Sequence, residues 1–300
     1  MLISVIIPTY NREVSLIRTI KNILKGKIPE NDYEIIVCDD GSTDNTKILI
    51  KDLMKVHSSI KYIQLTHTGN PAKVRNAGLK KAKGTIIAFT DNDTLPNEEW
   101  LMNGIKHFTN KDIAGVEGYI CTDKLLIRNW YAPVKDRRSE KDNPHSWYGY
   151  FLANMFYKKE ILEKIGGFDE SFITNEDIDI AWRVLSFGKI IFDEDVSVFH
   201  YPVKKERKEF LSFLKDRRIY DALLFKKHSD NFVRMFKRTF NYQRKILGAV
   251  NYIFCLVKGA FIFKVLPPFY KLLPFLFKYY LNELIFSFIR IKNRIKRKYS

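Results

Sequence analysis

The first ninety residues alternate between short apolar runs and segments whose apolar residues recur at helical spacing. Runs of this length, bounded by polar turns, are typical of buried strands, and the spacing between them is typical of amphipathic helices. A repeated strand–helix–strand order favours parallel pairing, so the pattern predicts an α/β fold with a mostly parallel sheet flanked by helices. Strands are expected at 2–7, 34–38, 60–65 and 85–89, and helices at 14–24, 48–54 and 71–82.

Residues 97–200 continue the pattern less regularly. The polar segment 121–148 is long for a loop in a compact domain, which is typical of a functional flap or a disordered loop. No G-x-G-x-x-G turn follows the first strand, which argues against a dinucleotide-binding domain. Helices are expected at 97–108, 158–165 and 176–187, and strands at 113–120, 148–157 and 189–200.

The net charge of +17 is concentrated in the last third of the chain. Residues 201–300 hold 24 Lys and Arg but only 6 Asp and Glu, so residues 1–200 are nearly neutral. The basic residues are interleaved with apolar runs at 246–263 and 272–289, which favours an anionic membrane surface over nucleic acid. We predict a helical, basic membrane-association region at 206–300, lying in the interface or forming a short hairpin. An ordinary helical cap is the alternative.

Three cysteines, Cys38, Cys121 and Cys255, lie far apart and show no metal-ligand spacing. They argue against a disulfide scaffold or a zinc site and favour a reducing compartment. The chain enters a strand-like run at once, so we expect no signal peptide.

Two carboxylates, Asp91 and Asp93, directly follow the apolar run at 85–89. In an extended backbone, side chains two residues apart point the same way. Both could therefore converge on one hard cation, Mg²⁺ or Mn²⁺, at the carboxyl end of a strand, where open α/β sheets bind ligands. A simple polar turn is the alternative.

Six short motifs occur in a fixed order: VIIPTYN at 5–11, VCDDGSTD at 37–44, RNAG at 75–78, DND at 91–93, GGFDE at 166–170 and NEDID at 175–179 with Arg183. Together they resemble a family 2 glycosyltransferase. The resemblance covers about residues 3–200 and implies a GT-A nucleotide-sugar-binding fold and inversion at the anomeric carbon. It divides a catalytic domain at 1–205 into a nucleotide-binding half, 1–93, and an acceptor and catalytic half, 94–205.

The residue chemistry agrees with a nucleotide-sugar site. Short polar and backbone groups near Thr9 can line a nucleobase pocket, and the family places the acidic residue that matches Asp39 on uridine. Arg75 could offset phosphate charge or hold a neighbouring carboxylate, the alternative being a surface helix charge. Asn154 follows an aromatic segment where family members build the floor of the sugar site. The predicted nucleotide-sugar-binding residues are Pro8, Thr9, Tyr10, Asn11, Asp39, Asp40, Arg75, Asp91, Asn92, Asn154 and Gly167.

The resemblance also implies metal ligands and a general base. Asp93 matches the usual direct ligand, Asp91 more often contacts ribose or bound water, and His200 matches a further ligand, with a structural histidine as its alternative. An inverting transfer needs one base to accept the proton of the acceptor hydroxyl. The family assigns that role to the residue matching Asp177, while Glu176 orients the site or raises the pKa of its neighbour. Asp179 and Arg183 are expected to form an ordinary i,i+4 ion pair.

The sequence therefore predicts an inverting, metal-dependent glycosyltransferase of the hexosyl- or N-acetylhexosaminyltransferase type. The expected donor is a nucleotide sugar, most simply a UDP-sugar. The expected acceptor is a lipid-linked saccharide or a cell-surface glycan at the cytoplasmic face of the cell membrane. A transferase acting on a soluble protein or small molecule is one alternative, and a non-catalytic nucleotide-sugar-binding scaffold is another. A nucleic-acid partner is not expected, and the oligomeric state is left open.

Overall fold

A computed structural model describes residues 2–122, 150–201 and 219–232 of the chain. The chain divides into two compact units, Met1–Leu214 and Lys215–Ser300. In the second unit, residues 219–227 and 229–232 are helical, and the rings of Phe225 and Phe232 pack edge to face with their centroids 5.5 Å apart. The predicted domain boundary at 205 stays a prediction.

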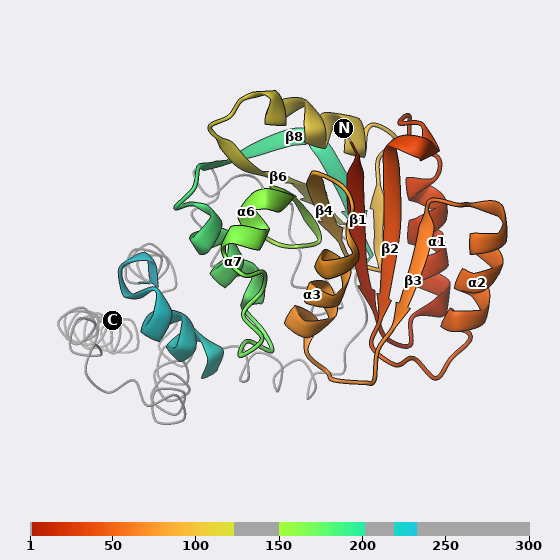
Figure 1. Cartoon of the computed structure of the whole chain (residues 1–300), viewed down its shortest axis with the longest axis horizontal. Coiled ribbons are helices and arrows are strands. Elements are labelled where there is room, and N and C mark those ends of the chain that lie inside the picture. Colours follow the sequence, from red (N-terminus) through yellow and green to blue (C-terminus); the bar gives the residue numbers. More distant parts are fainter. Residues whose placement is uncertain (1, 123–149, 202–218, 233–300) are drawn as a thin grey trace, which may run out of the picture. The chain divides into compact units, whose positions relative to one another are not determined.

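The described part of the first unit alternates strands and helices (Figure 1). In chain order, the elements are β1 (Ile3–Thr9), α1 (Glu13–Ile23), η1 (Glu30–Asp32), β2 (Tyr33–Asp39), α2 (Thr46–Val56), β3 (Ile60–Gln64), α3 (Pro71–Lys81), β4 (Ile86–Thr90), β5 (Thr94–Pro96), α4 (Trp100–Ile105), η2 (Lys106–Thr109), β6 (Ile113–Cys121), β7 (Asn154–Lys158), α6 (Lys159–Lys164), α7 (Glu176–Val184) and β8 (Lys189–His200).

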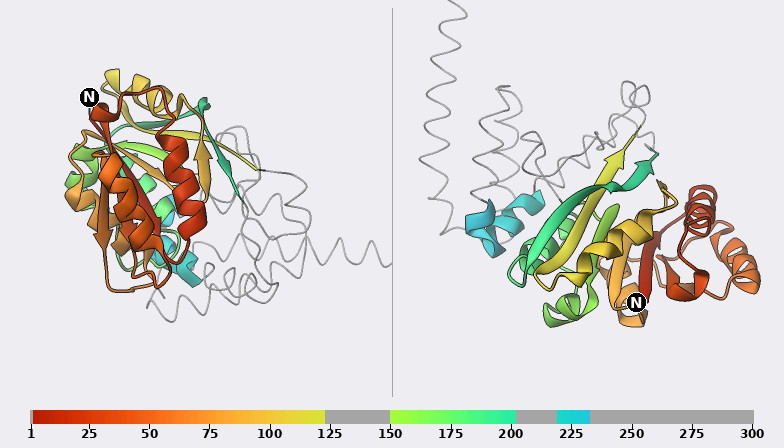
Figure 2. Two further views of the ribbon diagram at one scale, coloured as in Figure 1. Left: turned by 90° about the vertical axis from the view of Figure 1, so that its right-hand side faces the viewer. Right: turned by 90° about the horizontal axis from the view of Figure 1, so that it is seen from above.

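Within the described residues, the strands form one sheet in the order β3-β2-β1-β4-β7-β6-β8-β5. The first four of these are parallel, but β7 is antiparallel to both β4 and β6, and β5 is antiparallel to β8. The sheet is therefore mixed, where the sequence pattern predicted a mostly parallel one. The difference arises after β4, where the chain enters the short β5 through the turn at 91–93 and β7 later inserts between β4 and β6, a pairing between segments far apart in the sequence. Views from two further sides show how strongly the strands twist between β1 and β8 (Figure 2).

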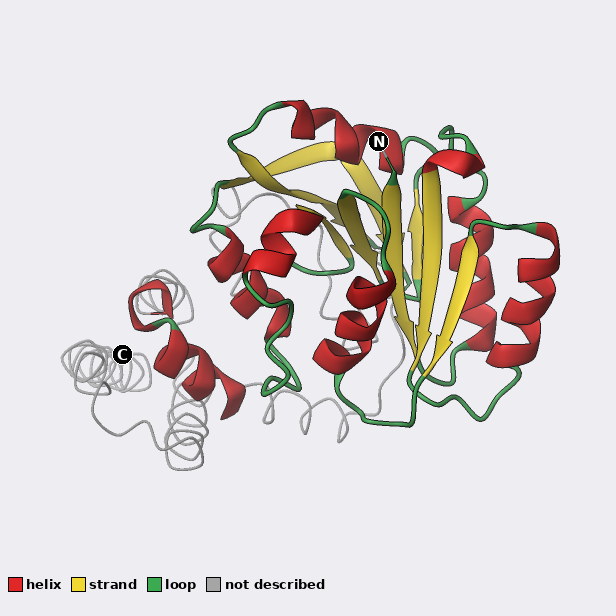
Figure 3. Cartoon of the chain, in the orientation of Figure 1, coloured by secondary structure: helices red, strands yellow, loops and turns green. Residues whose placement is uncertain are grey.

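Helices lie on both faces of the sheet (Figure 3). Alternate residues of the central strands enter two separate apolar cores, one on each face. On β1, Val5 and Ile7 face the core that contains residues of α1, α2 and α4, whereas Ile6 faces the core that contains residues of α3, α6 and α7. This is the period-two alternation of a strand buried on both sides. Helices therefore cover both faces, as expected for a doubly wound α/β fold.

Helix α3 lies directly on the sheet because of Gly78. A Cβ atom there would lie 2.7 Å from the sulfur of Cys38 and 2.8 Å from Cγ2 of Ile6. Since L side chains cannot approach so closely, glycine allows α3 to pack against β1 and β2. This packing fixes the level at which α3 presents its polar residues near the carboxyl ends of the strands.

Among the described residues, none of the helices combines the length and the apolar character needed to cross a bilayer. The apolar runs at 246–263 and 272–289 and the polar segment 123–148 lie outside the described residues.

Candidate active site

The carboxyl ends of β1, β2 and β4 meet at one edge of the sheet, where Asp39 is fully buried. Its Oδ1 accepts hydrogen bonds from the backbone N–H of Ser42 at 2.8 Å and from the Ser42 hydroxyl at 2.6 Å. The hydroxyl of Tyr62 donates to Oδ2. Burial raises the pKa of Tyr62, and Asp39 adds to the rise, so Tyr62 remains a donor. The Asp39 carboxylate is thus held in a fixed orientation, and its contact with a nucleotide stays a prediction.

Asp40 organises the loop at 67–69. Its Oδ1 accepts from the backbone N–H and the hydroxyl of Thr68, both at 2.9 Å, and its Oδ2 accepts from the N–H of Gly69 at 2.8 Å. The His67 ring lies 3.1 Å from Asp40 Oδ2 and stacks on Tyr10 with the ring centroids 4.1 Å apart. Asp40 therefore positions the stacked rings of His67 and Tyr10, of which Tyr10 is 41% exposed. The sequence reasoning had not singled out His67.

Two asparagines connect the turns at this edge. Asn11, at φ 50°, accepts from the backbone N–H of Thr43 at 2.8 Å. Asn92 donates to the carbonyl of Pro8 at 3.2 Å and to the hydroxyl of Thr9 at 3.1 Å. Asn92 is therefore bonded to the end of β1 at Pro8 and Thr9, and Asn11 to the turn after β2 at Thr43. Their contact with a nucleotide stays a prediction.

Asp91, Asp93 and His200 form a cluster whose ligand atoms all lie within 4.8 Å of one another. The backbone leaves the strand at Thr90, so the two carboxylates do not converge along an extended chain as predicted. They converge through the turn that leads to β5, and β5 pairs Thr94 opposite His200. This pairing brings Nε2 of His200 to 3.4 Å from Oδ1 of Asp93.

The electrostatics of this cluster suit a cation. Burial raises the pKa of the Asp93 carboxyl, and the neighbouring charge of Asp91 raises it further, while His200 and Arg12 oppose the rise. A bound cation would offset the repulsion between the carboxylates of Asp91 and Asp93. Two carboxylates and an imidazole are also ligands that Mg²⁺ or Mn²⁺ accepts. The residues present therefore fit a divalent cation.

Arg75 joins two parts of the site. It is only 6% exposed, so the interpretation as a surface helix charge is wrong. Its NH1 donates to Oε1 of Glu176 at 2.9 Å, and its NH2 donates to Oδ1 of Asp91 at 3.1 Å. The guanidinium therefore holds two carboxylates, one from the turn after β4 and one from the first residue of α7.

The predicted base, Asp177, lies in the first turn of α7. Its neighbour Glu176 is buried, whereas Asp177 is partly exposed, so the two side chains point in different directions, as expected on a helix. Asp177 Oδ1 accepts from the N–H of Ile178 at 2.9 Å. The positive end of the helix dipole favours a charged carboxylate here. Its role as base stays a prediction.

The predicted ion pair between Asp179 and Arg183 of α7 is confirmed, and Arg183 makes further hydrogen bonds. Arg183 donates to Oδ2 of Asp179 from Nε at 2.9 Å and from NH2 at 2.6 Å. Its NH1 also donates to the carbonyls of Ile165 at 3.0 Å and Gly167 at 2.7 Å. Arg183 therefore ties α7 to the turn after α6.

The same turn is bonded to α3 by Asn76, which belongs to the RNAG motif but was not among the predicted site residues. Asn76 accepts from the N–H of Phe168 at 2.8 Å and donates to its carbonyl at 2.9 Å and to Oε1 of Glu170 at 3.0 Å. Gly167 has φ 72°, and a Cβ there would lie 2.6 Å from Oδ1 of Asn76. The close approach that glycine permits is thus to Asn76, and contact of Gly167 with a sugar stays a prediction.

Asn154 lies in the protein interior instead of at the site's surface. It is 0% exposed, and its Oδ1 accepts from the indole N–H of Trp100 at 2.8 Å. Its Nδ2 donates to the carbonyls of Tyr119 at 3.0 Å and Val196 at 2.8 Å. Because both amide hydrogens are engaged with β6 and β8, the structure gives no support to the predicted contact with a nucleotide sugar.

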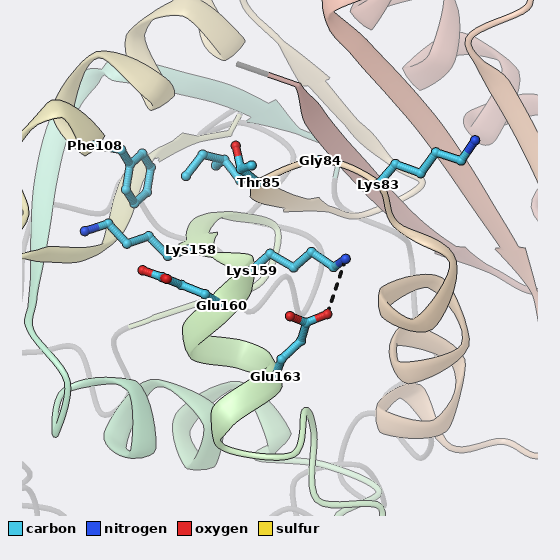
Figure 4. Close-up of a pocket in the computed structure, with 9 residues that line it drawn as sticks. Lys83, Gly84, Thr85, Phe108, Lys158, Lys159, Glu160 and Glu163 are labelled. Atoms are coloured by element: carbon cyan, nitrogen blue, oxygen red, sulfur yellow. Dashed lines mark ion pairs between the residues drawn. The ribbon is translucent and has the colours of Figure 1, made fainter.

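An open pocket of about 340 Å³ lies elsewhere (Figure 4). It includes Gly84, Thr85 and Ile86, where β4 begins, and the ion pair between Lys159 and Glu163 at 3.2 Å. The acidic cluster follows the other end of β4, so this pocket is separate from the candidate active site.

The comparisons agree with this arrangement. The family model of glycosyl transferase family 2 matches residues 4–166. A relative from Campylobacter jejuni, a GalNAc(5)-diNAcBac-PP-undecaprenol beta-1,3-glucosyltransferase, is 32% identical over 183 residues, which cover 58% of this chain and 57% of that protein. The chain spans 21–69% of the length of the curated relatives it matches, including 44% of a mycobacterial one.

Solved structures show the same fold. Staphylococcus aureus TarS 1–349 in complex with UDP-GlcNAc has a TM-score of 0.63 at 21% identity, covering 86% of this chain and 80% of that one. The mannosyltransferase PcManGT from Pyrobaculum calidifontis, in complex with GDP-Man and Mn²⁺, has a TM-score of 0.63 at 18% identity, covering 86% and 74%. The predicted GT-A type of α/β fold is therefore confirmed. Because its model matches more than half of the sequence, this chain belongs to glycosyl transferase family 2.

Proposed function

We propose that this chain is an inverting, divalent-metal-dependent glycosyltransferase that uses a nucleotide sugar, most simply a UDP-sugar. The observation that carries the proposal is the bridge made by Arg75 between Asp91 and Glu176. It brings the turn with the candidate cation ligands and the start of α7 with Asp177 into one site. Cation ligands and a general base are the two parts that such a transfer needs together.

In the proposed reaction, Asp177 accepts the proton of an acceptor hydroxyl while the oxygen of that hydroxyl forms a bond to the anomeric carbon. The bond from that carbon to the diphosphate oxygen breaks on the opposite face, and its electron pair leaves with the nucleoside diphosphate. A single base suffices, because the nucleophile and the leaving group lie on opposite faces. The partial exposure of Asp177 is what an approaching acceptor requires.

Asp91, Asp93 and His200 would hold Mg²⁺ or Mn²⁺. A bound divalent cation stabilises the negative charge that develops on a departing diphosphate. Support comes from the raised pKa of Asp93, which reflects burial and its acidic neighbour, and from the Mn²⁺ in the PcManGT complex. Asp39 and the exposed ring of Tyr10 are proposed to bind the nucleoside, as the UDP-GlcNAc in TarS suggests.

A metal-ligand variant tests this proposal. We expect wild-type protein to be stabilised against heat by one nucleotide sugar with Mn²⁺ or Mg²⁺ but not with EDTA, and to hydrolyse it slowly. Asp93→Asn should lower the apparent metal affinity by at least about tenfold, since a charged ligand is lost. The matched control is Asp52→Asn, an exposed carboxylate of α2, which should behave as wild type.

Each other outcome is informative. Equal binding of the nucleotide sugar in EDTA would contradict the metal dependence. Binding without turnover, even with a membrane extract as acceptor, would favour the non-catalytic scaffold. If no nucleotide sugar of a panel with uridine, guanosine and thymidine diphosphates binds, the proposed function is wrong.

We further propose a lipid-linked saccharide or cell-surface glycan as acceptor, reached at the cytoplasmic face of the membrane. The undecaprenol-linked acceptor in the name of the Campylobacter relative supports this choice. So does the excess of Lys and Arg in residues 201–300, which are threaded through apolar runs. A soluble acceptor remains the alternative.

Vesicle flotation of the full chain tests the membrane proposal. We expect flotation with vesicles containing phosphatidylglycerol, weakened by high salt, and much less with pure phosphatidylcholine vesicles, because the attraction is partly electrostatic. Protein that never floats would contradict the proposal. Salt-sensitive binding to DNA without flotation would indicate a nucleic-acid partner instead.

A further inference from the structure

We propose that Arg75 is the internal counter-cation of this site: it positions Asp91 and Glu176 and keeps the cation site weak until a nucleotide diphosphate binds. This inference rests on the proposed function and names a positioning residue for it. Its basis is the pair of contacts from one guanidinium to two carboxylates on different elements, at 2.9 and 3.1 Å.

The Arg75–Glu176 half of the bridge lies largely away from water, whereas the Asp91 side chain is 32% exposed. The Arg75 side chain is 7% exposed and that of Glu176 is 11% exposed. Arg75 cannot easily retreat, because Gly78 seats α3 against β1 and β2 and Asn76 bonds the helix to the 168–170 turn. Charges in such a setting are poorly screened, so each acts strongly on its neighbours.

Arg75 competes with a cation for Asp91. The Asp91 oxygen that accepts from Arg75 belongs to the same carboxylate that lies within the 4.8 Å cluster with Asp93 and His200. A divalent cation bound there would sit close to a fixed positive charge, which weakens its binding. The two negative phosphates of a nucleotide would restore the balance. Cation and nucleotide should therefore strengthen each other's binding, since such coupling is reciprocal.

The other branch of the guanidinium acts on α7. Glu176 is the first residue of that helix, and Asn175 before it has a left-handed backbone at φ 69°. Fixing the Glu176 carboxylate thus fixes the direction in which α7 starts and where its next residue, Asp177, points. A lysine would keep the charge but, with a single ammonium, would not reproduce the planar fork that spans both carboxylates.

Two substitutions distinguish the effect of the positive charge of Arg75 from the effect of its planar guanidinium, which bonds two carboxylates. The readout is Mn²⁺ binding to the nucleotide-free chain, followed by the electron paramagnetic resonance signal of free Mn²⁺, then repeated with UDP. We expect Arg75→Gln to bind Mn²⁺ alone roughly tenfold more tightly, to lose most of the gain from UDP, and to turn over at least about 30-fold more slowly. Arg75→Lys should keep the weak Mn²⁺ binding of the wild type and still lose turnover.

The matched control is Lys80→Gln, which removes the same charge from the exposed end of α3 and should change neither quantity. Unchanged or weaker Mn²⁺ binding by folded Arg75→Gln would overturn the counter-cation role, because a merely structural residue gives that result. Full turnover in Arg75→Lys would overturn the role of the planar guanidinium. If Arg75→Gln does not fold, the turnover of Arg75→Lys decides whether Arg75 positions the site. A wild type that binds Mn²⁺ and UDP cooperatively without any turnover would overturn the proposed function alone.

Discussion

Replacing Asp177 with asparagine is expected to lower the turnover number by about 10²–10⁴-fold, the range that general bases contribute. The amide has nearly the shape of the carboxylate but cannot accept the proton of the acceptor hydroxyl. Asp177 accepts a hydrogen bond from the N–H of Ile178, and the amide oxygen can accept the same bond. The fold and nucleotide binding should therefore persist. Transfer kinetics with a saturating acceptor, together with a UDP titration, measure the two effects separately.

The control for this experiment is again Asp52→Asn, which changes an exposed carboxylate paired with Lys55 on α2. If Asp177→Asn keeps more than about a tenth of wild-type turnover, another group is the base. If it loses UDP binding as strongly as turnover, Asp177 belongs to the donor site instead.

The nucleotide-binding half was predictable because its structure follows from local patterns. The strands expected at 2–7, 34–38, 60–65 and 85–89 lie within two residues of β1 to β4. Helices between them force crossovers, and crossovers force parallel pairing. Carboxyl ends of neighbouring parallel strands then meet, which is why Asp39 and Asp91 could be placed at one edge from sequence alone.

The second half was less predictable because its pairing depends on contacts between distant segments. Apolar periodicity does not show that β7 inserts between β4 and β6, or that it runs antiparallel to both. The strand expected at 148–157 begins only at Asn154, and β5, of three residues, had no periodic signal at all. Yet β5 determines the cation cluster, because its pairing with β8 brings His200 to Asp93.

The sequence also did not reveal which residues hold the predicted site in place. Tyr62 supports Asp39, His67 stacks on Tyr10, and Asn76 bonds the 168–170 turn, all across gaps in the sequence that no spacing rule connects. For Arg75 the sequence left three interpretations open, and burial between two carboxylates decided against the surface charge. The residue types at a strand end predict which side chains form the site, whereas the residues that hold those side chains in position depend on tertiary contacts.

Asn154 is where these two kinds of inference diverge most sharply, so its replacement by alanine is a decisive experiment. We expect Asn154→Ala to lower the free energy of unfolding by about 2–4 kcal/mol, since the buried N–H of Trp100 and the carbonyls of Tyr119 and Val196 lose a partner. At about 2–4 °C per kcal/mol, thermal melting should detect this clearly. The KM for the donor should be unchanged in the folded fraction.

Asn103→Ala is the matched control, because it removes an amide of α4 whose hydrogen bonds, to the carbonyl of Asp195 at 3.2 Å and to the Glu99 side chain, are exposed. It should cost less than about 1 kcal/mol. A normal melting temperature in Asn154→Ala, combined with a raised donor KM, would mean that this amide leaves its three bonds to contact the sugar. A lowered melting temperature with normal KM would instead assign Asn154 to the join between α4, β6 and β8, because a ligand contact cannot stabilise a chain from which the ligand is absent.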